Sequence, residues 1–84
     1  MPIPTNISHQ DILNAIERIN IQGIPPRRGP RHWAVLYNGT HYPCKLLISW
    51  ANEFANGAEL EYNSFISDQA RPFLIAREFN VVPF

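Results

Sequence analysis

Hydrophobic residues in the first quarter of the chain recur with the period of a helix. Ser8 is a favourable N-cap residue, and Asp11 follows in the first turn. Gly23 and the following Pro25-Pro26 pair end the helix, because a proline cannot continue it. The apolar residues spaced three and four apart, which predict one buried helix face, are Ile12, Ala15, Ile16 and Ile19.

Between residues 33 and 42 the pattern changes to the alternation of a β-hairpin. Asn38-Gly39 lies at its centre, and both residues tolerate the positive φ that a type I′ turn requires. The segment therefore predicts two antiparallel strands, Trp33 to Tyr37 and Thr40 to Tyr42. Tyr37 and Tyr42 are expected to pack as a cross-strand pair.

A second helix is predicted from Pro43 to Ala55, because proline suits a first helical turn and Gly57 follows as a terminator. In the connection of residues 58–67 the side chains expected to reach the core are Leu60, Tyr62 and Phe65. The third helix begins either at Ser67, with a bend at Pro72, or near Pro72 itself. The apolar stripe of the second helix comprises Leu46, Leu47, Trp50, Ala51 and Phe54.

The last apolar run, from Val81 to Phe84, predicts a strand beside the hairpin. The order of helix, hairpin, two helices and strand indicates a single α+β domain over residues 1–84, with a small antiparallel sheet packed against helices. A chain of 84 residues has room for one core. Because it ends on an apolar strand, we expect it to be the N-terminal part of a longer protein.

Composition indicates a cytoplasmic protein. Cys44 is the single cysteine, which excludes an internal disulfide and a cysteine-rich zinc site and suits a reducing compartment. No apolar run approaches the roughly 20 residues of a membrane span. The start of the chain lacks the basic and apolar regions of a signal peptide. We therefore expect no membrane partner.

Charge is segregated along the chain although seven basic residues balance seven acidic ones. Residues 18–52 contain no aspartate or glutamate, and residues 46–70 contain no lysine or arginine. A positive block attracts anionic partners whatever the total charge, although a solvated surface loop is the alternative interpretation. Trp33 and Tyr42 are the aromatic residues expected to reach the surface, where they could stack on bases. The charged and polar candidates for DNA binding are Arg27, Arg28, Arg31, His32, His41 and Lys45.

Catalytic and metal sites find little support in the sequence. Cys44 lies in the first turn of a predicted helix, where the dipole could lower its pKa, and His41 is three residues away. Without an oxyanion or triad context, we interpret Cys44 as an ordinary small apolar residue. The three histidines fit no paired ligand motif, and there is no glycine-rich phosphate loop. We predict no catalytic residue, metal or cofactor.

One motif stands out as specific, Gly39-Thr40-His41-Tyr42-Pro43-Cys44-Lys45, preceded by the turn Gly23-Ile24-Pro25, by Arg28 and by Trp33-Ala34-Val35. Together these motifs resemble the N-terminal head domain of McrA-like, modification-dependent HNH restriction endonucleases. The likeness extends over almost the whole chain. Two departures are Ile66-Ser67-Asp68-Gln69, where the family has a glycine-rich turn, and Cys44, where it often has a second proline.

The resemblance implies a non-catalytic module of a type IV restriction endonuclease that binds double-stranded DNA carrying methylated or otherwise modified cytosine. It also implies a covalently linked HNH nuclease domain elsewhere in the protein. Arg28, Tyr42 and Lys45 are the candidates that match the family motif. The alternative is a protein-interaction or dimerisation module of the same nuclease, which would explain an aromatic-rich domain of zero net charge.

Overall fold

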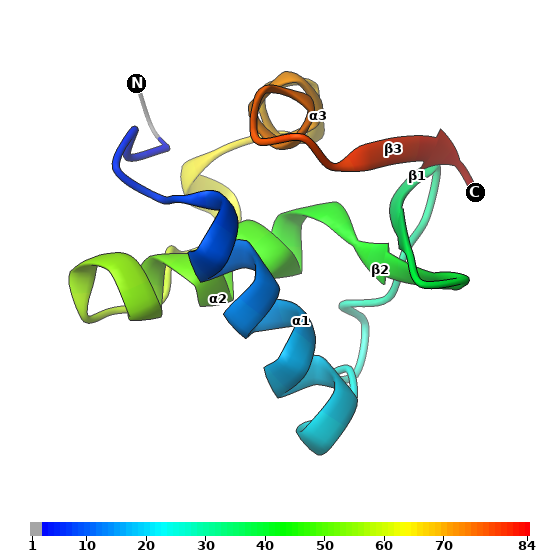
Figure 1. The fold of residues 1–84 in the computed structure, drawn as a ribbon, viewed down its shortest axis with the longest axis horizontal. Coiled ribbons are helices and arrows are strands. Elements are labelled where there is room, and N and C mark those ends of the chain that lie inside the picture. The colour runs from blue at the N-terminus through cyan, green and yellow to red at the C-terminus, as the bar shows by residue number, and fades with distance from the viewer. Residues whose placement is uncertain (1–2) are drawn as a thin grey trace.

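The computed structural model describes residues 3–84 and has the predicted α+β architecture (Figure 1). Three helices accompany a three-stranded antiparallel sheet with the strand order β2-β1-β3. Within residues 3–84 no helix has the length and apolar character needed to cross a membrane. The elements in chain order are α1 (His9–Gln22), β1 (Trp33–Tyr37), β2 (Thr40–Pro43), α2 (Cys44–Asn56), the 3₁₀ turn η1 (Tyr62–Ser64), α3 (Ser67–Ala76) and β3 (Asn80–Pro83).

Local sequence signals determine the ends of α1. The Asp11 N–H donates to the Ser8 hydroxyl at 3.1 Å, and the Asp11 carboxylate accepts from the Ser8 N–H at 2.9 Å. This capping box satisfies two N–H groups that a helix start leaves without partners. The predicted apolar face is buried, and the Gly23 N–H closes the helix by donating to the Ile19 carbonyl.

The sheet has the register expected from the Asn38-Gly39 turn. Asn38 has φ of 50° and Gly39 has φ of 78°, the positive values that a type I′ turn requires. Val35 in the central strand β1 lies opposite Tyr42 of β2 and Val81 of β3. Tyr37 lies opposite Thr40, so the two tyrosines are diagonal neighbours instead of the expected direct pair.

The structure defines the bounds of α2 and α3 and the burial of the connection between them. Helix α3 begins at Ser67 and contains Pro72 in its interior. Helix α2 ends at Asn56 and is followed by Gly57, which adopts the left-handed conformation with φ of 88°. Phe65 is buried as expected, but Tyr62 is 43% exposed, which corrects its assignment to the core. Its ring lies in η1, beneath the basic side chains of Arg28 and Lys45 instead of in the core.

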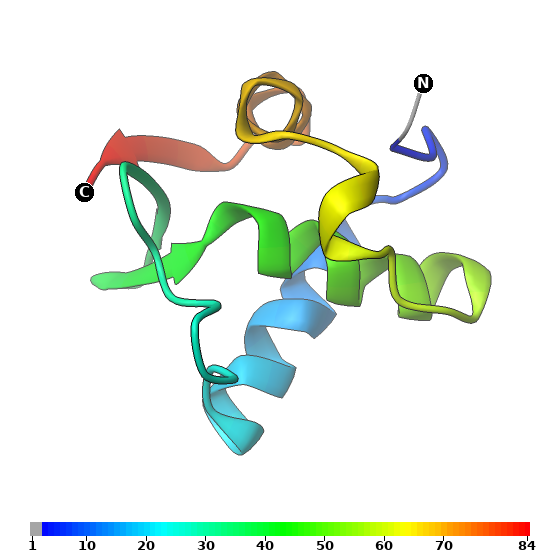
Figure 2. The same cartoon turned by 180° about the vertical axis from the view of Figure 1, so that it is seen from behind.

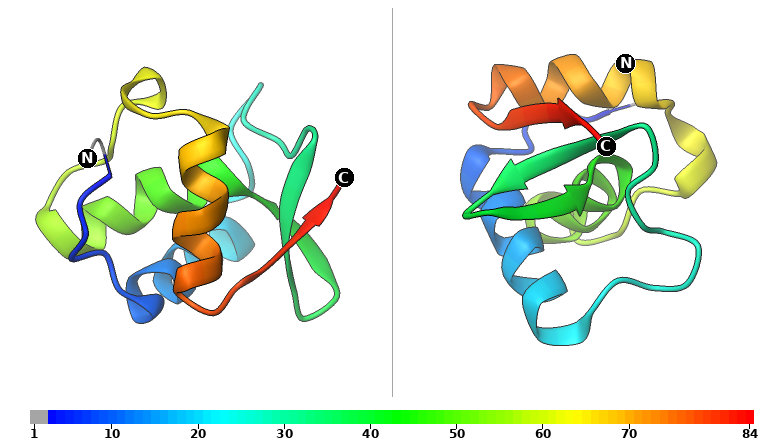
Figure 3. Two further views of the ribbon diagram at one scale, coloured as in Figure 1. Left: turned by 90° about the horizontal axis from the view of Figure 1, so that it is seen from above. Right: turned by 90° about the vertical axis from the view of Figure 1, so that its right-hand side faces the viewer.

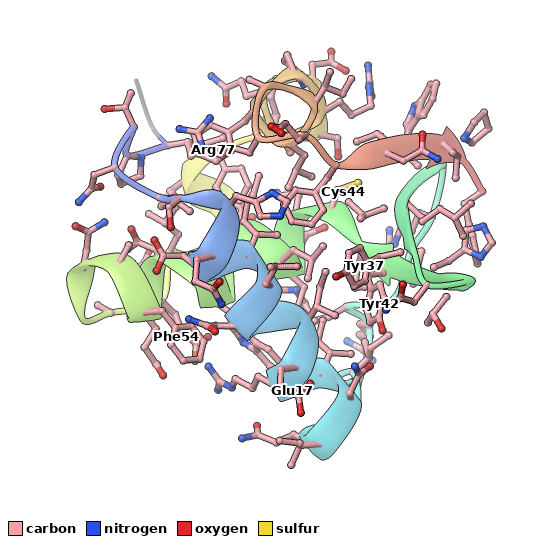
Figure 4. All side chains as sticks on the ribbon, viewed as in Figure 1. Glu17, Tyr37, Tyr42, Cys44, Phe54 and Arg77 are labelled. Carbon is pink, nitrogen blue, oxygen red and sulfur yellow. The ribbon has the colours of Figure 1, made fainter. Side chains whose placement is uncertain are left out.

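Helix α2 is the centre of the fold. It lies between α1 and α3, and the sheet packs at one end of the three helices (Figures 1 and 3). Arg77, at the end of α3, ties the N-terminal segment to this assembly (Figure 4). Its guanidinium donates to the carbonyls of Thr5, Ile7 and Phe73. These bonds hold Ile7 in the core, where it is almost fully buried.

Candidate functional site

One hollow, with a volume of about 560 Å³, brings together six of the eight residues predicted to bind DNA. It lies between the loop that joins α1 to β1, the first turn of α2, η1 and the start of α3. Figure 2 shows this loop and the start of α3 from the side on which both are visible. The predicted residues that line the hollow are Arg27, Arg28, Arg31, His32, Trp33 and Lys45.

A tight turn carries the first two arginines. The Arg28 N–H donates to the Pro25 carbonyl at 3.2 Å, so Pro26 and Arg27 occupy the two central positions. Arg27 has φ of 64°, which matches the third position of a type II turn, where glycine is favoured. A left-handed conformation costs a residue with a Cβ about 1–2 kcal/mol. The turn therefore displays an arginine at a position where local stability favours glycine.

Arg28 and Lys45 meet at the ring of Tyr62. The Lys45 Nζ lies 3.8 Å from the ring centroid and donates to the Tyr62 carbonyl at 2.6 Å. The Arg28 Cζ lies 4.8 Å from the same centroid, and its Nη2 is buried without a hydrogen-bond partner. Burial, and secondarily the charge of Arg28, lower the pKa of Lys45. The hollow thus holds two close cations, and an anion between them would be stabilised by both.

The part of the lining formed by Trp33 and the start of α3 combines an aromatic ring with a fourth arginine. The Arg71 Cζ lies 4.7 Å from the centroid of the Trp33 ring, and Arg71 forms an ion pair with Asp68 at 3.0 Å. Trp33 is 37% exposed. This wall therefore offers flat surfaces, an indole and a guanidinium plane, next to the positive charge.

The cations of the protein are concentrated at this hollow. It is lined by five of the seven lysine and arginine side chains but by a single carboxylate, that of Asp68. The other two arginines are engaged elsewhere. Arg18 forms ion pairs with Glu53 at 3.4 Å and Glu59 at 3.3 Å, and Arg77 donates to backbone carbonyls. Zero net charge therefore coexists with a strongly positive surface.

Two predicted residues lie away from the hollow. Tyr42 is only 4% exposed, and its hydroxyl donates to the Asn20 side chain at 2.7 Å, between the hairpin and α1 (Figure 4). The expectation that Tyr42 reaches the surface is therefore wrong, because the side chain is part of the core. His41 is exposed, and its ring packs edge-on against Phe84 with centroids 5.3 Å apart.

Sequence reasoning missed two residues that line the hollow, Arg71 and Tyr62. Arg71 lies outside the basic block and reaches it only because α3 folds back over the start of α2. Tyr62 lies between Leu60 and Phe65 in the sequence, which predicts that it reaches the core with them. A helical projection of residues 67–76 would have shown that Arg71 and Asp68 share one face, but it would not have shown what that face contacts.

Cys44 also lines the hollow, but it lacks the character of a nucleophile. Burial raises the pKa of its thiol to about 11, against a smaller opposing effect of Arg71. The lowering expected from the helix dipole is thus outweighed, and the thiol is protonated at neutral pH. In the part of the chain that is described, no group of three or more histidine, cysteine or acidic side chains is placed to hold a metal ion.

Comparisons of the chain with protein-family models, curated proteins and solved structures gave no match. The resemblance to the McrA-like head domain therefore stays a prediction. The hollow and its cations are the features on which a function can be based.

Proposed function

We propose that this domain is a non-catalytic DNA-binding module that contacts phosphates through the cations of the hollow. The observation that carries the proposal is the convergence of five basic side chains from three segments of the chain on a space lined by one carboxylate. Basic residues that serve only solubility are interspersed with acidic ones. A cluster of five cations with a single carboxylate instead favours an anionic partner, and binding gains free energy from the counterions released by DNA.

The individual groups suit phosphate oxygens. Arg27 and Arg28 present planar donor forks on a turn whose backbone is restrained by two prolines. Lys45 lies in the first turn of α2, where the N-cap Pro43 makes no side-chain hydrogen bond. A lysine opposes the helix dipole there, but a phosphate would be attracted by both the ammonium and the unpaired N–H groups.

The finer proposal, that the module reads methylated cytosine for a linked nuclease, is supported by the resemblance to the McrA-like head domain. Trp33 offers an apolar surface at the edge of the positive hollow. Burying one methyl group contributes about 0.8 kcal/mol, which corresponds to about a fourfold preference. Discrimination by this domain alone should therefore be small.

The test is a titration of the domain with matched methylated and unmethylated duplexes at about 50 and 200 mM salt. We expect tighter binding at low salt and a modest preference for the methylated duplex. Equal binding of the two duplexes would remove the methyl-reading proposal and leave a backbone anchor. Absence of binding at low salt would overturn DNA binding.

A matched pair of variants makes the titration specific to the hollow. Arg31→Gln removes a cation from the hollow and should reduce the slope of log affinity against log salt by about one. Arg18→Gln is the control, because Arg18 is already neutralised by Glu53 and Glu59. Equal effects of both changes would mean that binding is spread over the surface.

The protein-interaction alternative is favoured by one specific observation. Ile21 of α1 is 75% exposed and Phe54 of α2 is 47% exposed, and both line a shallow groove between these helices. An apolar interface weakens little with salt, in contrast to phosphate contacts. Self-association that persists in high salt and is abolished by Phe54→Ser would favour this function.

A further inference from the structure

We infer that the hollow receives a single unstacked nucleotide of DNA, with its phosphate between Arg28 and Lys45 and its base against Trp33 and Arg71. The inference rests on the proposed DNA binding and specifies which form of DNA the site takes. In this inference one nucleotide enters the hollow. The alternative is that the hollow contacts only the outer surface of an intact duplex.

The shape of the hollow is the first argument that it receives a single nucleotide. A volume of about 560 Å³ lies within the range of about 300–1,000 Å³ typical of pockets that enclose a small ligand. The backbone of a duplex is convex and presents its phosphates across a broad surface. A recess with the basic groups on its walls is better suited to one group that protrudes from a strand.

The end of the hollow at Tyr62 suits a phosphate. Arg28 and Lys45 both lie over the Tyr62 ring, and neither forms an ion pair within residues 3–84. The buried Nη2 of Arg28 lacks a partner, which is an unfavourable state for a guanidinium nitrogen. A phosphate that entered the hollow would supply acceptors for Arg28 and would compensate the charge that burial disfavours on Lys45.

The end at Trp33 suits a base. Trp33 is partly exposed and carries the Arg71 guanidinium 4.7 Å from its ring centroid. Aromatic and guanidinium planes are the surfaces on which unpaired bases stack, with about 1–3 kcal/mol gained per base. A paired base inside a duplex is already stacked on its neighbours, so an intact duplex would leave this wall unused.

Tryptophan fluorescence reports base contact directly, because the two tryptophans differ in exposure. Trp50 is buried beneath Arg18, whose Cζ lies 3.9 Å from its ring centroid, whereas Trp33 is accessible. The probes are a single-stranded oligonucleotide, a fully paired duplex of the same length, the same duplex with one mismatch, and inorganic phosphate. All titrations use the complete 84-residue chain at one low salt concentration.

We expect the single strand to bind at least about fivefold more tightly than the paired duplex and to quench fluorescence, from the stacking energy of one base. Quenching by the mismatched duplex would show that the nucleotide can enter from an otherwise paired strand. Quenching by the single strand alone would restrict the site to unpaired DNA. Either result supports the inference, and inorganic phosphate should bind weakly without quenching.

Two outcomes separate this inference from the function on which it rests. If the paired duplex binds as tightly as the single strand and no probe quenches, the nucleotide site is overturned while DNA binding stands. If no DNA binds at low salt, both are overturned. Trp33→Leu should remove the quenching and the preference for single strands but keep the salt dependence, because it changes no charge. If Trp33→Leu leaves the preference intact, the base does not lie on Trp33.

Discussion

The Lys45 ammonium and the Arg28 guanidinium lie over the same tyrosine ring, with Nζ 3.8 Å and Cζ 4.8 Å from the Tyr62 centroid. No carboxylate forms an ion pair with either cation in the described part of the chain. The face of the ring offsets part of their mutual repulsion, by about 0.5–1 kcal/mol for each contact. Tyr62 therefore acts as a spacer that keeps two basic groups close together in the absence of an anion.

Replacement of Tyr62 with leucine should separate two contributions to DNA affinity, the position of the cations and their number. Tyr62→Leu keeps all the cations but removes the ring that positions two of them. We expect DNA affinity to fall about fivefold, from the loss of roughly 1 kcal/mol, with the salt dependence unchanged. Titrations at two salt concentrations measure both quantities. A reduced salt slope would instead mean that the cations no longer contact phosphate at all.

Replacement of Arg27 with glycine should stabilise the fold and weaken binding. Arg27 has φ of 64°, so glycine would relieve strain, and we expect the free energy of unfolding to rise by about 0.5–1 kcal/mol. Urea denaturation measures this gain, and titration should show weaker DNA binding because one cation is lost. A loss of stability would show that the Arg27 side chain makes favourable contacts that outweigh the strain.

Glu78 provides the matched control for Arg27. It has φ of 70° at the end of α3, where its N–H donates to the Ile75 carbonyl at 2.9 Å and the Phe79 N–H donates to the Leu74 carbonyl at 3.1 Å. This is the Schellman arrangement, in which glycine is preferred. Glu78→Gly should give a similar gain in stability without any loss of DNA affinity, because Glu78 does not line the hollow.

The parts of the fold that the sequence predicts are those determined by neighbours in the chain. The Ser8–Asp11 capping box, the Asn38-Gly39 turn and the terminating Gly57 each depend on a few consecutive residues. Arg27 and Arg28 lie together for the same reason. Arg71 joins them only through the packing of α3 on α2, and no local pattern records that contact.

The burial of Tyr42 has a similar explanation. Alternation along the hairpin leaves open which face of the sheet the helices cover. The Asn20 side chain, 22 residues earlier in α1, accepts from the Tyr42 hydroxyl and satisfies it in the core. A tyrosine that looks suitable for a binding surface thus becomes a structural residue through one distant partner.

Tyr42→Phe should therefore affect stability and not binding. The change removes the hydrogen bond from the Tyr42 hydroxyl to Asn20 and leaves the ring in place. We expect a loss of about 1 kcal/mol in the free energy of unfolding and the wild-type affinity for DNA. Chemical denaturation and titration on the same preparation check both. A substantial loss of affinity at unchanged stability would return Tyr42 to the binding surface.

Arg77→Gln should release the N-terminal segment. The guanidinium donates to the carbonyls of Thr5 and Ile7 and stacks on Phe73, with Cζ 3.4 Å from the ring centroid. Loss of these charge-assisted bonds should cost about 2–3 kcal/mol and increase hydrogen exchange near Ile7. Arg18→Gln should cost less than about 1 kcal/mol, because its ion pairs involve exposed carboxylates. Equal losses would mean that Arg77 does not anchor the segment.

The thiol of Cys44 should make the domain sensitive to alkaline pH. Burial raises its pKa in the folded state to about 11 from an ordinary value of 9.0. Between these values the unfolded chain loses the proton and the folded chain keeps it, so ionisation favours unfolding. The stability associated with the neutral thiol is complete below pH 9 and is lost as the pH rises towards 11, by about 2–3 kcal/mol.

Comparison with Cys44→Ala isolates this effect. The lowered pKa of Lys45 acts in the opposite direction, since stability rises as that ammonium loses its proton, but it is common to both proteins. Urea denaturation from neutral to alkaline pH should show the difference in stability between the wild type and Cys44→Ala narrowing or reversing above about pH 9. Parallel curves for the two proteins would mean that the thiol titrates normally and is accessible to water. A buried and protonated thiol should also react slowly with alkylating reagents. An accessible, normally titrating Cys44 would instead be alkylated quickly.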